Sequence, residues 1–289
     1  MHYEGNIIRP PSEANSIILQ VTVGCSHNSC TFCGAFRDKK FYIKESTIVD
    51  DDIHFAAQYC RRQTTVFLAD GNALVLPQKK LVELLIKIKQ KLPQVRRINL
   101  YANARDILQH SVDELRELKK LGLQRIYMGL ESGHDPTLKA IAKGDDSKTI
   151  IAAGRIARDA GLFLSVTVLL GIAGIKHSLA HAKATALALN AIQPNQVAIL
   201  TLMIMNNTPL YKLAESGEFT IPARNDLFIE LRTLLEHLQL KRSQLQANHA
   251  SNYFSLDGRL PKDKEKFLSF INDAVSGTMN LKPENQRAL

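Results

Sequence analysis

Three of the four cysteines of the chain lie within nine residues, and thiolates are strong ligands for soft metal centres. Cys25, Cys30 and Cys33 have the spacing C-x4-C-x2-C and directly follow an apolar run at residues 17–23. Because this run is typical of a strand, the thiols are expected on the loop that leaves it. A loop this short can surround one compact inorganic group, so these cysteines are the candidate metal ligands.

The spacing leaves more than one metal group open. Zinc requires a fourth ligand, and the nearby candidate, His27, lies inside the same tight turn. A cubane iron–sulfur cluster held by three thiolates keeps one iron open, whereas electron-transfer ferredoxins close all four positions with cysteine. An open iron implies chemistry, which favours the cluster. A disulfide with a spare thiol is less favoured because no signal-peptide pattern precedes the loop. Cys60 is expected to be a small core residue, which leaves no cysteines for a second cluster.

Six apolar, β-branched runs alternate with amphipathic helix patterns, at residues 17–23, 65–69, 97–101, 125–130, 162–170 and 196–203. This alternation predicts parallel strands joined by right-handed crossovers. Since six units are too few for a closed eightfold barrel, the predicted fold is α/β, a partial (β/α)6 TIM-like barrel. The predicted organisation is a lead-in at residues 1–16, the core at 17–222 and a C-terminal helical cover at 223–289. Within the cover, leucine spacing predicts one long helix at 227–245 and a last helix that begins near Pro261.

Unusual residues follow the carboxyl ends of the predicted strands, the edge where barrel and open α/β enzymes build their sites. They are Asp70, Gly71 and Asn72 after the second run, Tyr101 and Asn103 at the third, Glu131 and Ser132 after the fourth, and Gly171 and Gly174 after the fifth. Ordinary turns and strand-end packing are the alternative explanation for each of them.

The cysteine loop and these strand ends together resemble the radical S-adenosylmethionine (SAM) superfamily, in which three cysteines bind a [4Fe-4S] cluster and SAM chelates the fourth iron. Phe32, just before the last cysteine, matches the superfamily motif. The usual spacing is C-x3-C-x2-C, so this chain carries one extra residue between Cys25 and Cys30. The resemblance covers residues 17–209. It implies an enzyme that cleaves SAM reductively to a 5′-deoxyadenosyl radical, which abstracts hydrogen from a substrate, with a reductant such as flavodoxin or ferredoxin.

The run Gly129–Gly133 resembles the Gly-x-(Glu/Gln)-Ser signature of the branch that includes elongator-type, methylthiotransferase-type and coproporphyrinogen-dehydrogenase-type enzymes. This resemblance implies that Glu131 contacts the ribose hydroxyls of SAM and that Lys143 pairs with the methionyl carboxylate, although a solvated helix-end lysine is an equal alternative. The turn at residues 70–72 would bind the methionyl ammonium of SAM, and the turn at 171–174 would approach its adenine. The predicted cofactor-binding residues are Phe32, Asp70, Gly71, Asn72, Tyr101, Asn103, Glu131, Ser132, Lys143, Gly171 and Gly174.

The formal charge of +9, from 37 basic and 28 acidic residues, permits a phosphate-rich partner without requiring one. Because the lysines are dispersed over several segments, a small-molecule substrate is favoured, with RNA modification as the alternative and a non-enzymatic zinc or iron–sulfur protein as a second alternative. Asn248, His249 and Asn252 are the candidate substrate contacts, and a capping turn explains them equally well. No apolar run reaches the length of a membrane span, and a cytoplasmic location is expected.

Overall fold

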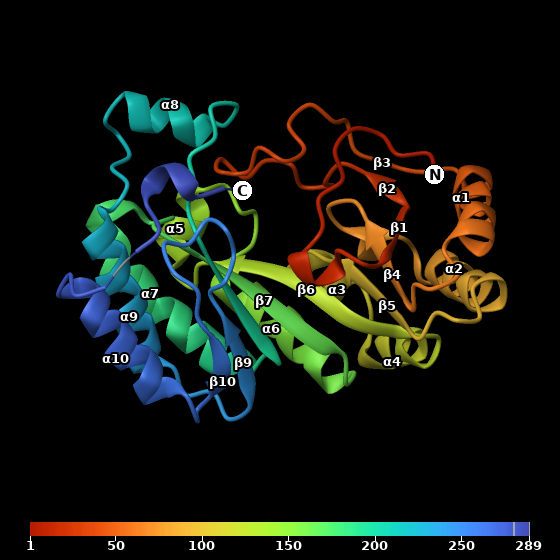
Figure 1. Ribbon diagram of the computed structural model, residues 1–289. Helices are drawn as coiled ribbons and strands as arrows, with labels where there is room; N and C mark the ends of the chain where they lie inside the picture. Colours follow the sequence, from red (N-terminus) through yellow and green to blue (C-terminus); the bar gives the residue numbers. More distant parts are fainter. Residues whose placement is uncertain (280, 289) are drawn as a thin grey trace. The chain divides into compact units, whose positions relative to one another are not determined.

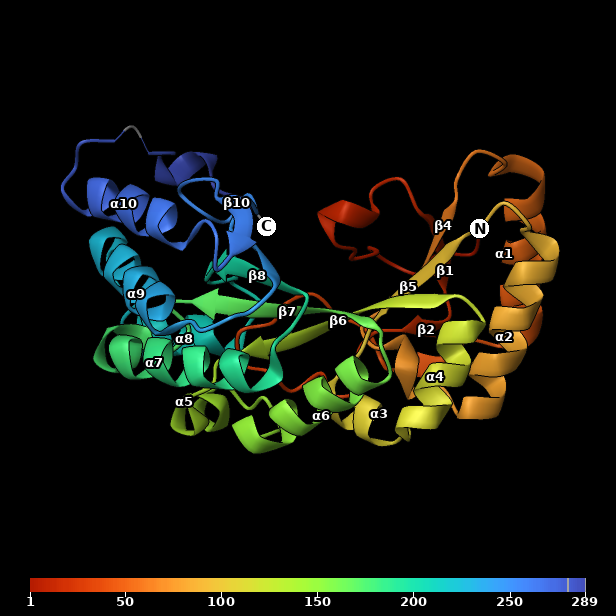
Figure 2. The ribbon, with the colours of Figure 1, turned by 90° about the horizontal axis from the view of Figure 1, so that it is seen from below.

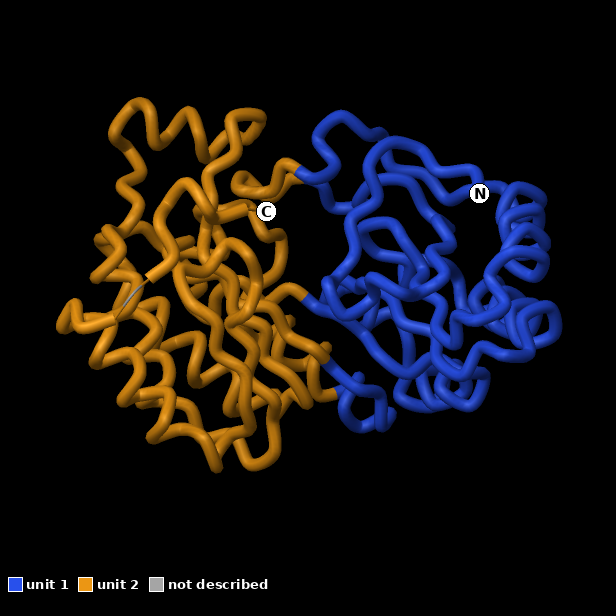
Figure 3. Tube along the Cα trace, viewed as in Figure 1, with its two compact units in different colours: residues 1–28, 35–128, 156–164 blue, residues 29–34, 129–155, 165–289 orange. Residues whose placement is uncertain are grey.

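The computed structural model describes residues 1–279 and 281–288 of the chain (Figure 1). The chain forms two compact units (Figure 3). Unit 1 contains residues 1–28, 35–128 and 156–164, and unit 2 contains residues 29–34, 129–155 and 165–289. This division passes through the cysteine loop, so Cys25 belongs to unit 1 whereas Cys30 and Cys33 belong to unit 2. The predicted domain boundaries at residues 16 and 222 stay a prediction.

One mostly parallel sheet runs through the chain. Its strands are β1 (Ile17–Gln20), β4 (Thr65–Ala69), β5 (Arg97–Tyr101), β6 (Leu123–Glu131), β7 (Phe163–Leu170), β8 (Gln196–Thr201), β9 (Ser243–Gln246) and β10 (Asp257–Leu260), and they lie in this order across the sheet. Parallel registers join β1 to β4, β4 to β5, β5 to β6, β7 to β8 and β8 to β9, whereas β10 is antiparallel to β9. The predicted α/β class and parallel sheet are confirmed.

Unit 1 is built on the strands β1, β4 and β5 and the first part of β6. The predicted first strand, residues 17–23, is divided in two. The first part, β1, pairs with β4, and the Val21 amide after it still donates to the Ala69 carbonyl over 2.7 Å. The second part, β2 (Thr22–Val23), pairs with β3 (Tyr42–Ile43). Helices α1 (Ser46–Tyr59), α2 (Gln78–Lys91) and α4 (Val112–Lys120) lie next to one another along this unit (Figure 2). Its remaining elements are η1 (Pro11–Glu13), η2 (Ala73–Val75) and α3 (Ala104–Leu108).

Unit 2 covers its strands with a helical layer in which α7 (Gly174–Ile192) packs against α9 (Arg224–His237), and α9 against α10 (Lys264–Val275) (Figure 1). The elements α5 (Asp135–Ala140), α8 (Pro209–Glu215) and η3 (Glu284–Gln286) also lie in this unit, and α6 (Ser147–Asp159) crosses the boundary between the units. The expected last helix after Pro261 is α10. In the described residues, no helix combines the length and the apolar content that crossing a membrane requires.

The predicted long helix at residues 227–245 is wrong at its C-terminal part, because α9 ends at His237 and residues 243–246 form strand β9. Side chains from the end of α7 form hydrogen bonds with the backbone that follows α9. Asn190 donates to the His237 carbonyl (2.9 Å) and accepts from the Gln239 amide (2.6 Å), and Gln193 accepts from the Lys241 amide (3.0 Å). These tertiary hydrogen bonds replace the next helical turn, so the cover supplies two strands as well as helices.

Candidate functional site

Cys25 sits directly against the turn that follows β4. The Gly71 amide donates to the Gly24 carbonyl over 3.0 Å, and a Cβ atom at position 71 would lie 2.8 Å from the Cys25 Cβ and 3.0 Å from its Cα. Real Cβ atoms do not approach this closely, so position 71 requires glycine for the cysteine loop to lie where it does. The Cys25 thiol is free of disulfide bonding, and the Asn103 Nδ2 donates to its sulfur at 4.0 Å.

Asn72, which follows strand β4, forms hydrogen bonds with Ser26 of the cysteine loop. Its Oδ1 accepts from the Ser26 amide (3.0 Å), while its Nδ2 donates to the Ser26 Oγ (2.6 Å) and to the Asp106 Oδ2 (2.9 Å). Asp106 also accepts from the Asn103 amide at 3.1 Å, which closes a capping box at the start of α3. Because the Asn72 side chain is fully buried, its polar atoms fix the residue next to Cys25.

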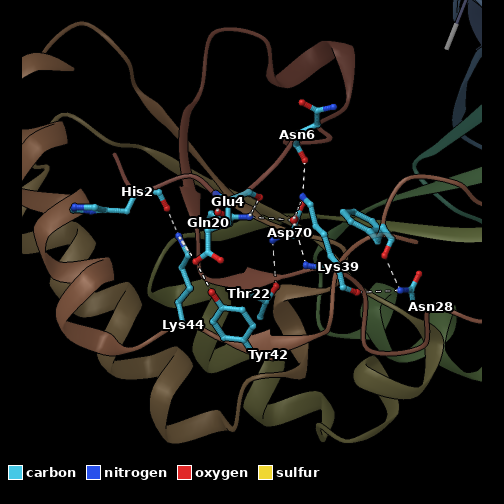
Figure 4. Close-up of polar contacts among 12 residues, drawn as sticks. His2, Glu4, Asn6, Gln20, Thr22, Asn28, Lys39, Tyr42, Lys44 and Asp70 are labelled. Atoms are coloured by element: carbon cyan, nitrogen blue, oxygen red, sulfur yellow. Dashed lines mark hydrogen bonds and ion pairs between the residues drawn. The ribbon is translucent and has the colours of Figure 1, made fainter.

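Asp70 is completely buried and forms an ion pair with Lys39, 3.1 Å between Oδ2 and Nζ (Figure 4). The same Oδ2 accepts from the Gln20 side chain (3.1 Å) and from the Gly24 amide (3.3 Å). Burial raises the pKa of Asp70, and the bond to Lys39 acts against that rise. Within the described residues the Asp70 Oδ1 lacks a hydrogen-bond partner, so one buried acceptor is left for a further donor.

Lys39 was not among the expected site residues. Its ammonium also donates to the Asn6 carbonyl at 2.7 Å, so this one side chain connects the segment before β1, the loop after the cysteines and the end of β4 (Figure 4). Nothing in its spacing marked it, because neighbouring basic residues of this loop look the same in sequence.

Tyr101, at the end of β5, packs into an aromatic cluster of unit 1. Its ring meets the Phe67 ring edge-on with centroids 5.1 Å apart, and the Tyr127 ring at 5.8 Å. Burial raises the pKa of Tyr101, so its hydroxyl stays protonated. The packing role is established by these contacts, and a cofactor contact of Tyr101 stays a prediction.

In unit 2, the segment that carries Cys30 and Cys33 is held by backbone bonds on both sides. The Thr31 amide donates to the Ile141 carbonyl (2.9 Å), and the Leu210 amide donates to the Thr31 carbonyl (3.0 Å). Cys33 in turn donates to the Cys30 carbonyl at 3.3 Å. Both thiols are free of disulfides and half-buried, as is Phe32 between them. These backbone hydrogen bonds fix the position of the segment that carries the two cysteines.

Glu131 and Lys143, twelve residues apart, form an ion pair of 3.1 Å in unit 2 with each side chain 13% exposed. A Cβ at Gly129 would lie 2.1 Å from the Glu131 Oε1 and 2.9 Å from the Lys143 Nζ, so any larger residue there would displace the pair from this arrangement. Glu131 itself adopts a left-handed backbone with φ of 60° at the end of β6. The structure therefore brings together the two residues that the resemblance assigned to the ribose and to the methionyl carboxylate of SAM.

Ser132 points into the protein instead of toward the strand-end edge. It is fully buried, and its Oγ lies 2.7 Å from the His181 Nδ1 of α7. His181 Nε2 lies 3.5 Å from the Glu230 Oε1, and Glu230 accepts from the Gly171 amide (2.8 Å) and from the Ser178 hydroxyl. Burial raises the pKa of Glu230 to about 7 and lowers the pKa of His181 to about 3. Sequence analysis missed this network because its two titratable members lie in ordinary helix patterns.

Both glycines of the 171–174 turn have left-handed backbones, with φ of 81° at Gly171 and 65° at Gly174. A Cβ at Gly171 would lie 2.9 Å from the Leu227 Cδ2, and one at Gly174 would lie 3.2 Å from both the Phe219 ring and the Thr220 carbonyl oxygen. The turn thus packs closely on the segment that leads into α9. Its predicted approach to adenine stays a prediction.

The three candidate substrate contacts differ in their surroundings. Asn252 is 1% exposed, and its amide bonds strand β8 through the Thr201 hydroxyl (2.7 Å) and the Ile199 carbonyl (2.8 Å). His249 is half-buried and accepts from the Ser251 amide at 3.1 Å, whereas Asn248 is exposed. Since both ends of the Asn252 amide are bonded inside unit 2, this residue positions the loop.

Each unit supplies donors whose chemistry suits the expected cofactors. Three cysteines that form no disulfide are the number of thiolate ligands that a cubane cluster with one open iron requires. The Glu131–Lys143 pair offers a carboxylate for hydroxyl groups and an ammonium for a carboxylate. Among residues 1–279 and 281–288, no three Cys, His, Asp or Glu side chains are grouped as they would be around a single metal ion.

The mostly parallel sheet, with its polar groups at the carboxyl ends of strands, defines an α/β protein of partial-barrel type. The family model for the radical SAM superfamily matches residues 19–184, which is more than half of the chain, and the chain belongs to this superfamily. Radical SAM enzymes use a [4Fe-4S] cluster and SAM.

Two curated relatives and one solved structure are similar to parts of the chain. It is 26% identical to the heme chaperone HemW of Bacillus subtilis over 55% of this chain and 41% of that protein. It is 27% identical to the tRNA uridine(34) acetyltransferase of Methanocaldococcus infernus over 42% of this chain and 23% of that protein. Methylornithine synthase has a similar fold, with a TM-score of 0.54 at 15% identity over 78% of this chain and 65% of that one. The chain thus spans less than half the length of either curated relative.

Proposed function

We propose that this protein is an enzyme that binds one [4Fe-4S] cluster through Cys25, Cys30 and Cys33 and cleaves SAM reductively. The observation that carries the proposal is the set of three cysteines, none of them in a disulfide, on one short loop inside the matched superfamily region. When bound, the cluster would supply the electron that breaks the S–C5′ bond of SAM, releasing methionine and a 5′-deoxyadenosyl radical for hydrogen abstraction. The electron would come from a reductant such as flavodoxin or ferredoxin.

The residues of the chain would bind and orient SAM. Lys143 would present its ammonium to the methionyl carboxylate, and Glu131 would accept hydrogen bonds from the ribose hydroxyls, since each offers the complementary charge or acceptor. Asp70 would accept from the methionyl ammonium through the oxygen that the protein itself leaves unbonded. Gly71 would keep Cys25 close to that group, because no larger residue fits beneath the loop.

We favour a small-molecule substrate, on the basis that the basic residues are spread along the sequence. RNA is the second candidate, supported by the net charge of +9 and by the similarity to a protein named as a tRNA acetyltransferase. The two differ in salt dependence, because RNA binding releases counterions and weakens steeply as salt rises. Salt-sensitive binding of tRNA by the purified protein would contradict the small-molecule proposal and support RNA as the substrate.

Cluster content tests the assignment of the ligands. Anaerobically reconstituted protein is expected to bind about four irons and four sulfides per chain. Cys25→Ala, Cys30→Ala and Cys33→Ala should each abolish this content, whereas Cys60→Ala, which changes the remaining cysteine, should retain it. Stoichiometric zinc without labile sulfide in anaerobically purified parent protein would refute the cluster and support the non-enzymatic zinc alternative.

A further inference from the structure

A polar depression opens in unit 1 at the edge of the sheet where the strands begin. It consists of two adjoining cavities of about 550 and 340 Å³, which share Ser12, Thr65 and Arg97 as lining residues. We call it the basal pocket; its other lining residues used below are Glu13, Arg62, Asn99, Arg125 and Phe163. Cys25 and Gly71 lie beyond the opposite, carboxyl ends of the same strands, so the basal pocket is separate from the candidate cofactor site.

Three arginines give the basal pocket a positive lining. Arg62 and Arg97 line the larger cavity together with the hydroxyl residues Ser12 and Thr65, and Arg97 continues into the smaller cavity beside Arg125. In the part of the chain that the structure describes, none of these three guanidinium groups has a carboxylate partner. Guanidinium groups recognise phosphate through paired N–H donors, so the larger cavity suits a phosphoryl group.

Arg125 is the most firmly held of the three. Its guanidinium stacks on the Phe163 ring with 4.1 Å to the ring centroid, and its Nη1 donates to the Tyr127 hydroxyl at 3.1 Å. These contacts orient it before any ligand arrives, which reduces the entropy lost on binding.

The smaller cavity contains acceptors. Asn99 is 5% exposed, and its Nδ2 donates to the Glu13 Oε1 at 2.8 Å, which directs its Oδ1 away from that bond. This Oδ1 has no hydrogen-bond partner among the described residues. A buried unsatisfied acceptor costs free energy unless a donor from solvent or ligand reaches it. A ligand hydroxyl group at this end of the basal pocket would supply that donor.

We propose that the basal pocket binds a sugar phosphate group, with its phosphate at Arg62 and Arg97 and its hydroxyl groups toward Asn99. The combined chemistry, arginines in both cavities and the unbonded Asn99 acceptor in the smaller one, matches a phosphorylated pentose better than a simple anion. The cavity volumes lie in the range of small-molecule sites. A free sugar phosphate and a mononucleotide share this group, and both are candidate sources of it.

Equilibrium dialysis with ribose 5-phosphate, AMP, inorganic phosphate and ribose tests the proposal on the full chain reconstituted with its cluster. The sequence offers matched controls, because Arg61 and Arg96 are exposed and adjoin Arg62 and Arg97 without lining the basal pocket. Arg62→Gln and Arg97→Gln should each weaken binding of ribose 5-phosphate or AMP at least tenfold, the loss expected for a charge-assisted hydrogen bond. Arg61→Gln and Arg96→Gln remove the same charge and should change it less than twofold.

Binding of either sugar phosphate above that of phosphate and ribose supports the proposal, and the tighter ligand identifies the source. Equal losses in the lining and control variants would overturn it, since they would indicate unspecific charge attraction. Absence of binding by the parent at millimolar ligand would also overturn it, as would binding of an RNA oligonucleotide without binding of either small sugar phosphate. Iron and sulfide content, unchanged in all four variants, separates this result from the proposed SAM chemistry.

Discussion

Glu230→Gln should make the protein more stable than the parent at neutral and alkaline pH. Glu230 is wholly buried, and burial raises its pKa from 4.5 to about 7. The folded state therefore favours the protonated carboxyl, and the stability that this proton contributes is complete below pH 4.5 and is lost as the pH rises to 7. At about 1.4 kcal/mol per pH unit, the shift corresponds to about 3 kcal/mol of unfolding free energy. Glutamine cannot ionise, so the variant does not lose this stability.

Urea unfolding of parent and variant at half-unit steps from pH 4.5 to 8 measures the effect. The difference in unfolding free energy should move by about 3 kcal/mol in favour of Glu230→Gln across this range. The neighbouring His181, whose pKa is lowered to about 3, stays in both proteins, so its own titration largely cancels in the difference. Glu236→Gln is the matched control, since Glu236 is exposed on the same helix. A pH-independent difference, or an equal change in the control, would refute the argument.

Three further substitutions test other contacts. Lys39→Met should destabilise the protein by about 3–5 kcal/mol in urea unfolding, because it leaves the buried Asp70 carboxylate without its cation. The control Lys40→Met, at an exposed position, should change stability by less than about 0.5 kcal/mol. Similar effects of the two substitutions would contradict the buried ion pair. Gly129→Ala should displace the adjoining ion pair and weaken SAM binding by about 1–3 kcal/mol in anaerobic equilibrium dialysis, and unchanged affinity would argue against a SAM-binding role for that pair. Asn252→Ala should lower the unfolding free energy by about 1–3 kcal/mol, and a fully stable variant would show that its two bonds to β8 are dispensable.

The sequence predicted those elements whose signals are local. Strands β4 and β5 coincide with the apolar runs at residues 65–69 and 97–101. Strand β9 was missed because its four residues continue a leucine-rich helical pattern, and the side chains that end α9 come from α7, about fifty residues earlier in the chain. Local periodicity carries no information about such partners.

In the candidate site, too, the sequence indicates which residues are involved but not all of their tertiary contacts. Glu131 and Lys143 were placed in one site by resemblance, and their ion pair brings them into contact. Ser132 was assigned to the cofactor by its position in the same run, and this stays a prediction; the structure shows its side chain buried against His181. Adjacent residues beyond a strand end face different ways, and only the three-dimensional path of the chain decides which one meets the core.

Anaerobic assay of SAM cleavage tests the central proposal most directly. The reconstituted parent, reduced with dithionite and mixed with SAM, should form 5′-deoxyadenosine and methionine in equal amounts, slowly in the absence of substrate. Cys33→Ala should form neither product, and Cys60→Ala should behave as the parent. Failure of a fully cluster-loaded parent to form 5′-deoxyadenosine would contradict reductive SAM cleavage by this protein.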